Sequence, residues 1–240
     1  MMSVLEIKNF SKSYGGGKYA AKDVNLSVEA GDIYAFIGHN GAGKSTTIKS
    51  VVGVLDFEEG DILVNGHSVK TEPMEVKREI AYIPDNPDLY EHLTAIQYLN
   101  FIADIFGIDA DVRRQRIESY AKEFEIEDAL NDLISSFSHG MKQKIAIISA
   151  LIHEPKLFIL DEPFVGLDPK AALTLKNIMK RMCESGCAVF FSTHVLDVAE
   201  KLCNKMAIIK GGSIIVTGNM EELTADKSLE DVFMEVTEHE

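Results

Sequence analysis

The sequence predicts an α/β fold with a mainly parallel sheet and a helical subdomain inserted into it. Short apolar runs alternate with helical stretches in the first and last thirds of the chain, as is typical of βαβ units. The middle third has almost no strand pattern and carries apolar residues at helical spacing. At 240 residues the chain can form one large domain or a domain with an inserted subdomain.

The first third contains a strand–loop–helix unit. Alternation at residues 24–28 indicates a half-buried strand, and the apolar run 33–37 indicates a buried one. A glycine-rich turn leads from this run into a helical stretch at 44–54. Residues 61–64 predict a further strand, because an Asn-Gly pair typical of tight turns follows them.

The middle and last thirds differ in their pattern. Apolar spacing predicts helices at 94–106 and 112–124, and Ser138 can cap another that runs to about His153. Strand–helix alternation resumes at Lys156 and ends in a hairpin across Gly211 and Gly212. The elements predicted after Lys156 are strands at 157–160 and 187–192, helices at 169–184 and 195–203, and hairpin strands at 205–209 and 213–217.

Composition excludes several classes of protein. No stretch approaches the roughly 18 apolar residues of a membrane helix, and the N-terminus lacks the regions of a signal peptide. We therefore expect a cytosolic chain unless a partner holds it at a membrane. The net charge of −14 argues against nucleic-acid binding and against adsorption to anionic lipid. Three irregularly spaced cysteines fit neither a disulfide framework nor a common zinc pattern.

Residues 38–45 match the phosphate-binding pattern G-x-x-x-x-G-K-[ST] between a predicted strand and a predicted helix. Glycines allow backbone N–H groups to face phosphate oxygens, and the helix adds the positive end of its dipole. The Lys44 ammonium can reach the β- and γ-phosphates, and the Ser45 hydroxyl can bind Mg²⁺. The alternative is a glycine-rich turn with a chance lysine. The nucleotide-binding residues expected here are Gly38, His39, Asn40, Gly41, Ala42, Gly43, Lys44, Ser45 and Thr46.

Three further polar residues follow apolar strands. Asp161 and Glu162 end one predicted strand, so Asp161 can hold the Mg²⁺ shell and Glu162 can accept a proton from an attacking water. His194 follows another strand, where it can donate a hydrogen bond to the γ-phosphate. An isolated acidic pair would more often cap a helix, and a lone histidine would more often be structural. The upstream phosphate loop favours catalytic roles for Glu162, His194 and Lys44.

Residues 138–143, Ser-His-Gly-Met-Lys-Gln, resemble the signature sequence of ABC-family ATPases. With this run in place, the other family elements follow in order over essentially the whole chain. Tyr14 resembles the aromatic residue that stacks on adenine, which we favour over a place in the core, and His194 resembles the switch histidine. Residues 166–168 resemble the loop that crosses the dimer interface. The sequences around 161–169 and 228–233 are similar to those of ABC-2-type exporter subunits, such as the bacitracin-resistance, lantibiotic-resistance and Ecs-type ATPases.

The resemblance implies a P-loop NTPase fold, with a RecA-like core, an antiparallel β subdomain and an inserted α-helical subdomain. The implied division is an ATP-binding core at 1–86 and 155–218, a helical signature subdomain at 87–154, and an acidic helical tail at 219–240.

It also implies two ATP molecules between two chains arranged head to tail. Each ATP would contact Tyr14, the phosphate loop and Asp85 of one chain, and Ser138, Gly140, Met141 and Asp168 of the other. The implied cofactors are ATP and Mg²⁺, with Ser45, Asp161 and Asp85 as metal contacts. The implied partners are a second ATPase subunit and a separate transmembrane permease, which would hold the chain at the inner face of the membrane.

The chain departs from the common family pattern at two places. Asp85 stands where the family usually has a glutamine, so we expect altered coupling to the membrane partner. His139 stands in place of a glycine and either points into solvent, which we favour, or titrates near the partner's ATP. The permease is expected to dock near Leu89, Tyr90 and Leu93.

Two other functions compete with an exporter subunit. One is a soluble ABC ATPase that assembles a protein or cluster complex. The other is a nucleotide sensor without turnover, which Glu162 disfavours. The transported substrate belongs to the permease and is not encoded in this chain.

Overall fold

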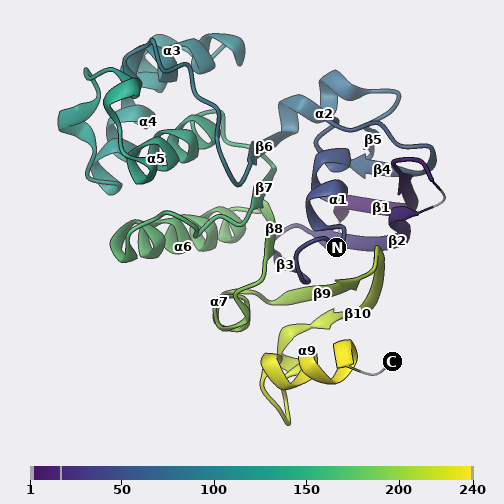
Figure 1. Cartoon of the computed structure of the whole chain (residues 1–240). Helices are drawn as coiled ribbons and strands as arrows, with labels where there is room; N and C mark the ends of the chain where they lie inside the picture. Colours follow the sequence, from purple (N-terminus) through teal and green to yellow (C-terminus); the bar gives the residue numbers. More distant parts are fainter. Residues whose placement is uncertain (1–2, 17, 239–240) are drawn as a thin grey trace.

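The computed structural model describes residues 3–16 and 18–238 (Figure 1). A six-stranded sheet forms its centre, with the spatial order β10-β9-β3-β8-β7-β6. β9, β3, β8, β7 and β6 are parallel, and only the β9–β10 hairpin is antiparallel. The strands are β3 (Ile33–Ile37), β6 (Ile80–Ile83), β7 (Leu157–Asp161), β8 (Ala188–Thr193), β9 (Lys205–Lys210) and β10 (Ser213–Asn219).

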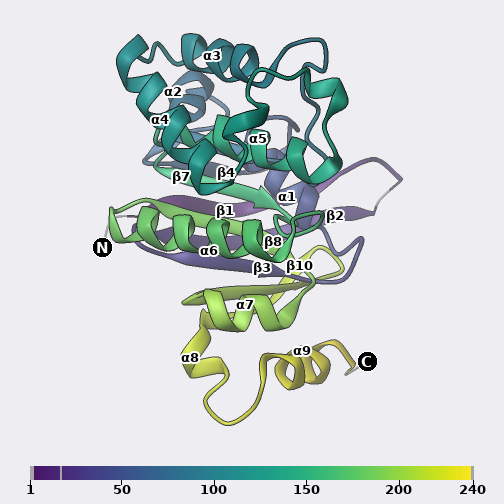
Figure 2. The same cartoon turned by 90° about the vertical axis from the view of Figure 1, so that its left-hand side faces the viewer.

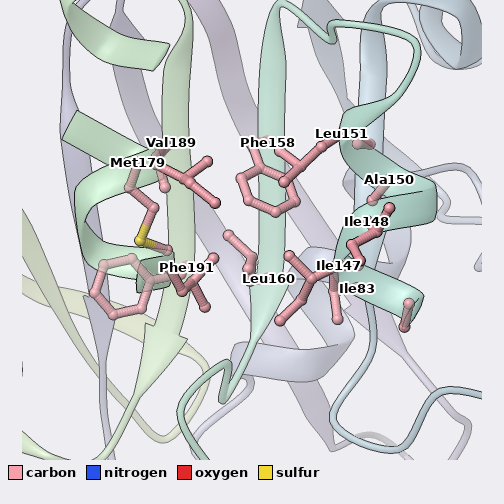
Figure 3. Close-up of a cluster of buried hydrophobic side chains, with 14 of the residues drawn as sticks. Ile83, Ile147, Ile148, Ala150, Leu151, Phe158, Leu160, Met179, Val189 and Phe191 are labelled. Atoms are coloured by element: carbon pink, nitrogen blue, oxygen red, sulfur yellow. The ribbon is translucent and has the colours of Figure 1, made fainter. Parts of the chain in front are cut away.

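Both faces of this sheet are buried, because alternate side chains of each central strand enter different cores. Phe158 and Leu160 of β7 face one core, and Leu157 and Ile159 face the other. Figure 3 shows Phe158 and Leu160 between side chains of α5 and Met179 of α6. A strand covered on both sides needs a continuous apolar sequence, which is why these strands are short, unbroken apolar runs.

A second, antiparallel sheet packs over the other core, with the order β2-β1-β4-β5. Helix α1 contacts both this sheet and β7. In Figure 1 the antiparallel strands lie on the opposite side of the central sheet from α5 and α6. The elements of this part are β1 (Ser3–Ser13), β2 (Tyr19–Glu29), α1 (Lys44–Val51), β4 (Glu59–Val64), β5 (His67–Ser68) and α2 (Pro73–Glu79).

Three helices between β6 and β7 form a separate group, at the top of Figure 2, and α7 to α9 lie at the bottom. Among the described helices, none combines the length and apolar character needed to cross a membrane. The helices after β6 are α3 (Ala95–Ile105), α4 (Ala110–Glu123), α5 (His139–Leu151), α6 (Pro169–Glu184), α7 (Leu196–Leu202), α8 (Met220–Leu223) and α9 (Leu229–Glu238), with 3₁₀ turns at Glu127–Ala129 and Ile134–Ser136.

The predicted fold class is confirmed: a mainly parallel α/β core with helices inserted after β6 and an antiparallel sheet. Individual strands were missed. β1 was not predicted, because Asn9 has a left-handed backbone and the strand register shifts around it, which interrupts the alternation of apolar and polar residues. β6 is only four residues long and lies between a helix and Pro84.

His153 joins the inserted helices to the sheet. Its ring stacks on Phe106 at the end of α3, with centroids 3.8 Å apart, and its Nε2 lies 3.0 Å from the carbonyl oxygen of Ile80 in β6. The Nδ1 atom is buried with no hydrogen-bond partner among the described residues. Burial lowers the pKa of His153, and the nearby Arg116 lowers it further. The native state therefore favours the neutral imidazole.

This burial predicts a loss of stability at acid pH. Because the native pKa of His153 lies below the unfolded value of 6.5, the unfolded chain binds the proton first as pH falls. Its contribution is complete above pH 6.5 and declines below it, until the native histidine also protonates. We expect the wild type to lose more unfolding free energy between pH 7 and pH 5 than His153→Gln does. Urea unfolding at both pH values checks this, and equal losses would contradict it.

Candidate functional site

The phosphate loop connects β3 to α1 and is shaped by glycines that no other residue could replace. Gly43, at the N-terminus of α1, has φ 113°, and a Cβ there would collide with the carbonyl oxygen of Ala20 in β2. A Cβ on Gly38 would lie 2.5 Å from the carbonyl oxygen of Ile209 in β9. Neighbouring strands thus hold the loop on two sides.

Lys44 is almost fully buried, at 6% exposed, at the start of α1. Its Nζ donates to the carbonyl oxygen of Gly38 at 2.7 Å and lies 3.4 Å from that of His39. The same Nζ lies 3.6 Å from Oε1 of Glu162. The carbonyl groups of the phosphate loop therefore hold the Lys44 ammonium in place, and this ammonium faces the Glu162 carboxylate.

Glu162 follows β7 in a left-handed conformation, with φ 50°, a strained geometry for a residue other than glycine. Its Oε2 lies 3.0 Å from Nδ1 of His194. Its backbone N–H is 3.2 Å from Oγ of Ser192, whose hydroxyl also donates to Asp161. Strands β7 and β8 therefore bring Asp161, Glu162, Ser192 and His194 together at their carboxyl ends.

A cavity of about 220 Å³ lies between the phosphate loop and the carboxylates of Asp161 and Glu162. Asp85, which follows β6, reaches it from the third strand end. Burial, followed by the negative charges of Asp161 and Asp85, raises the pKa of the neighbouring Tyr82 to about 12. The lining residues are Ala20, His39, Asn40, Gly41, Gly43, Lys44, Ser45, Thr46, Asp85, Asp161 and Glu162.

Tyr14 lies at the edge of this cavity and not in the core. Its side chain is 65% exposed, and its hydroxyl lies 3.3 Å from Oγ1 of Thr46 in α1. An exposed ring beside the phosphate loop is available to stack on a base. This placement removes the alternative that Tyr14 is an ordinary core residue.

The run 138–143 lies elsewhere in the chain and contributes nothing to the cavity lining. Ser138 caps α5, where its Oγ accepts from the backbone N–H of Met141 at 3.3 Å. Asp168 caps α6, and its Oδ2 lies 3.2 Å from Nζ of Lys144 in α5. The structure therefore separates the sequence-predicted site residues into two groups, one around Lys44 and the other at the start of α5.

His139 is exposed, as expected, but it is not surrounded by solvent alone. A Cβ added to Gly166 would collide with its imidazole ring. Gly166 lies in the loop before α6 and has φ 81°. His139, the first residue of α5, therefore packs against this loop.

Comparison with known proteins decides the family. The ABC transporter family model matches residues 21–165, and an ABC-type transporter ATP-binding protein of Bacillus subtilis, EcsA, is 36% identical over all of this chain and 98% of its own length. The chain belongs to the ABC transporter family. The SkfA peptide export ATP-binding protein SkfE of the same organism is 33% identical, covering 89% of this chain and 88% of SkfE. A solved ATP-binding subunit of an ABC transporter superposes with a TM-score of 0.94 and 36% identity, over 98% of this chain and all of that one.

The chain is accordingly an ATP-binding, ATP-hydrolysing ABC subunit. Sequence reasoning missed two contributors to this ABC ATPase site. Ser192 contacts the carboxylate of Asp161 and the backbone N–H of Glu162, and its position two residues before His194 at a strand end was the available signal. Ala20 lines the cavity through backbone packing against Gly43, for which the sequence carries no signal.

Proposed function

We propose that this ABC ATPase hydrolyses ATP between two copies of the fold and thereby drives an ABC-2-type exporter. One observation carries the proposal: Lys44, Asp161 and Glu162 share a cavity, whereas Ser138 and its helix lie outside it. A second chain placed head to tail would bring its own α5 over the open side of this cavity.

Each group has a distinct task in this scheme. The loop N–H groups and Lys44 bind the β- and γ-phosphates, and Tyr14 stacks on the adenine. Glu162 accepts the proton of the attacking water, and His194 orients Glu162 and the γ-phosphate. Asp168 and Lys144 hold the loop before α6 against α5. From the second chain, the N-terminus of α5 with Ser138, Gly140 and Met141 approaches the γ-phosphate.

The donor set fits Mg²⁺. Asp161 and Asp85 line the same cavity as Ser45, and carboxylate and hydroxyl oxygens are the ligands that this ion prefers. In the described part of the chain, no cluster of three or more His, Cys, Asp or Glu side chains could hold a metal by itself. The ion would therefore bind with the nucleotide phosphates, whose developing negative charge it would neutralise.

We propose the following division of the chain into subdomains. Residues 1–86 and 155–218 form the ATP-binding core, 87–154 the signature subdomain and 219–240 the acidic tail. The resemblance to SkfE, whose name records peptide export, supports export over import. We infer a separate permease that holds the chain at the inner face of the membrane.

One of the residues expected to contact the permease does not lie on the surface. Leu89 is buried in the core and cannot contact a partner, whereas Tyr90 is 50% exposed and packs 5.6 Å from the ring of Phe101, which is 41% exposed. Tyr90 lies in the loop before α3 and Phe101 lies on α3. An exposed aromatic pair of this kind is a surface suited to an apolar helix of a membrane protein.

Membrane retention tests this function. In native membrane fractions, the wild-type chain is expected to sediment with the membranes, and Tyr90→Glu with Phe101→Glu to move it to the supernatant. The purified double variant should hydrolyse ATP within twofold of wild type, because neither residue lines the cavity. Met74→Glu, at an exposed apolar residue of α2, is the matched control and should stay with the membranes. A wild-type chain found only in the supernatant would favour the soluble assembly ATPase instead.

A further inference from the structure

The C-terminal helix α9 forms hydrogen bonds at both ends with elements that lie next to the site. At its first turn, Glu200 of α7 accepts from the backbone N–H of Leu229 at 3.0 Å. At its last turn, Lys210 at the end of β9 donates to the carbonyl oxygen of Thr237 at 3.0 Å. Helix α7 begins two residues after His194, so α9 is connected to the segment that holds this histidine.

One face of α9 is buried, and one of its residues reaches the phosphate loop. Leu229, Val232 and Phe233 are buried at helical spacing. The Phe233 ring, 6% exposed, meets the imidazole of His39 edge-on, with centroids 4.8 Å apart and planes at 68°. Edge-to-face packing is a preferred geometry for aromatic rings.

His39 is a sensitive point of the loop. Its carbonyl oxygen accepts from the backbone N–H of Ala42 at 3.1 Å and lies 3.4 Å from Nζ of Lys44. A shift of His39 would therefore change both the closure of the loop and the surroundings of the lysine. The ring contact is the only aromatic contact to His39 in the described part of the chain.

We propose that Phe233 is a positioning residue for ATP binding, which holds His39 and through it the phosphate loop in the shape that receives the triphosphate. The proposal rests on the function proposed above for this loop. Phe233 does not line the cavity, so its effect is expected on the affinity for ATP and not on the chemical step.

Steady-state ATP hydrolysis by the full-length chain tests the proposal. An edge-to-face pair contributes about 1 kcal/mol, equivalent to about fivefold in affinity. Phe233→Ala should raise KM for ATP about fivefold and leave kcat within twofold of wild type. Phe233→Leu, which keeps most of the buried volume, should also raise KM. Met234→Ala, at an exposed neighbour on the same helix, is the matched control and should change neither constant.

A double-mutant cycle with His39→Ala tests whether Phe233 acts on the phosphate loop through His39. On that background, Phe233→Ala should raise KM less than twofold further, because the ring contact is already lost. Unchanged KM in the folded Leu variant would overturn the proposal, as would a full fivefold effect on the His39→Ala background. A wild-type chain that binds no ATP would instead refute the function proposed for the loop, so the two failures are distinguishable.

Discussion

Replacing Glu162 with glutamine is expected to lower kcat for ATP hydrolysis about 10²- to 10³-fold while ATP still binds. Glutamine keeps the size of the side chain but cannot accept a proton from water, and general-base catalysis contributes about 10²- to 10⁴-fold. The two other carboxylates that line the cavity, Asp161 and Asp85, are proposed to hold the metal, and Asp161 also accepts a hydrogen bond from Ser192. Phosphate release measures turnover, and equilibrium binding of a fluorescent ATP analogue measures affinity.

The same variant should accumulate in an ATP-bound dimer. With hydrolysis blocked, the nucleotide that joins two chains persists, and gel filtration with ATP and Mg²⁺ should show an earlier peak. Glu222→Gln, which removes an exposed carboxylate in α8, controls for the change of charge and should behave as wild type. A kcat for Glu162→Gln within threefold of wild type would refute the assigned role.

The second large effect distinguishes the group of residues around Lys44 from the group at the start of α5. Lys44→Ala removes the buried ammonium that faces both Glu162 and the loop carbonyls. A hydrogen bond to a charged group contributes about 1.5–3 kcal/mol, so ATP affinity should fall about 10- to 100-fold. Lys49→Ala, at an exposed lysine on the same helix, should retain the wild-type affinity.

Ser138→Arg should give the opposite result. ATP affinity should remain within twofold of wild type, because Ser138 does not line the cavity, whereas ATP-dependent dimerisation and turnover should be lost. Isothermal titration and gel filtration on both variants provide the comparison. If Ser138→Arg weakened ATP binding to the single chain as strongly as Lys44→Ala, the two groups would belong to one site within one chain.

Local sequence patterns predicted the phosphate loop, whereas other contacts of the site depend on packing between segments far apart in the sequence. Residues 38–45 are consecutive and lie between a strand and a helix, so their pattern could be recognised without knowledge of the packing around them. The meeting of Glu162 and His194 followed from a parallel sheet, whose strand ends share one edge. The contact between Phe233 and His39 could not be predicted, since it depends on how α9 packs against α7 and β9.

The contact between His139 and Gly166 has a consequence for how this sequence can change. Residue 139 can lose its ring without a clash. A side chain at residue 166 would force the His139 ring to move, and the positive φ of residue 166 disfavours a side chain there in any case. The two positions are therefore coupled: glycine is favoured at 166 while the His139 ring keeps this orientation. A chimera that receives residues 138–143 of this chain in another ATPase would need the loop before α6 from the same donor.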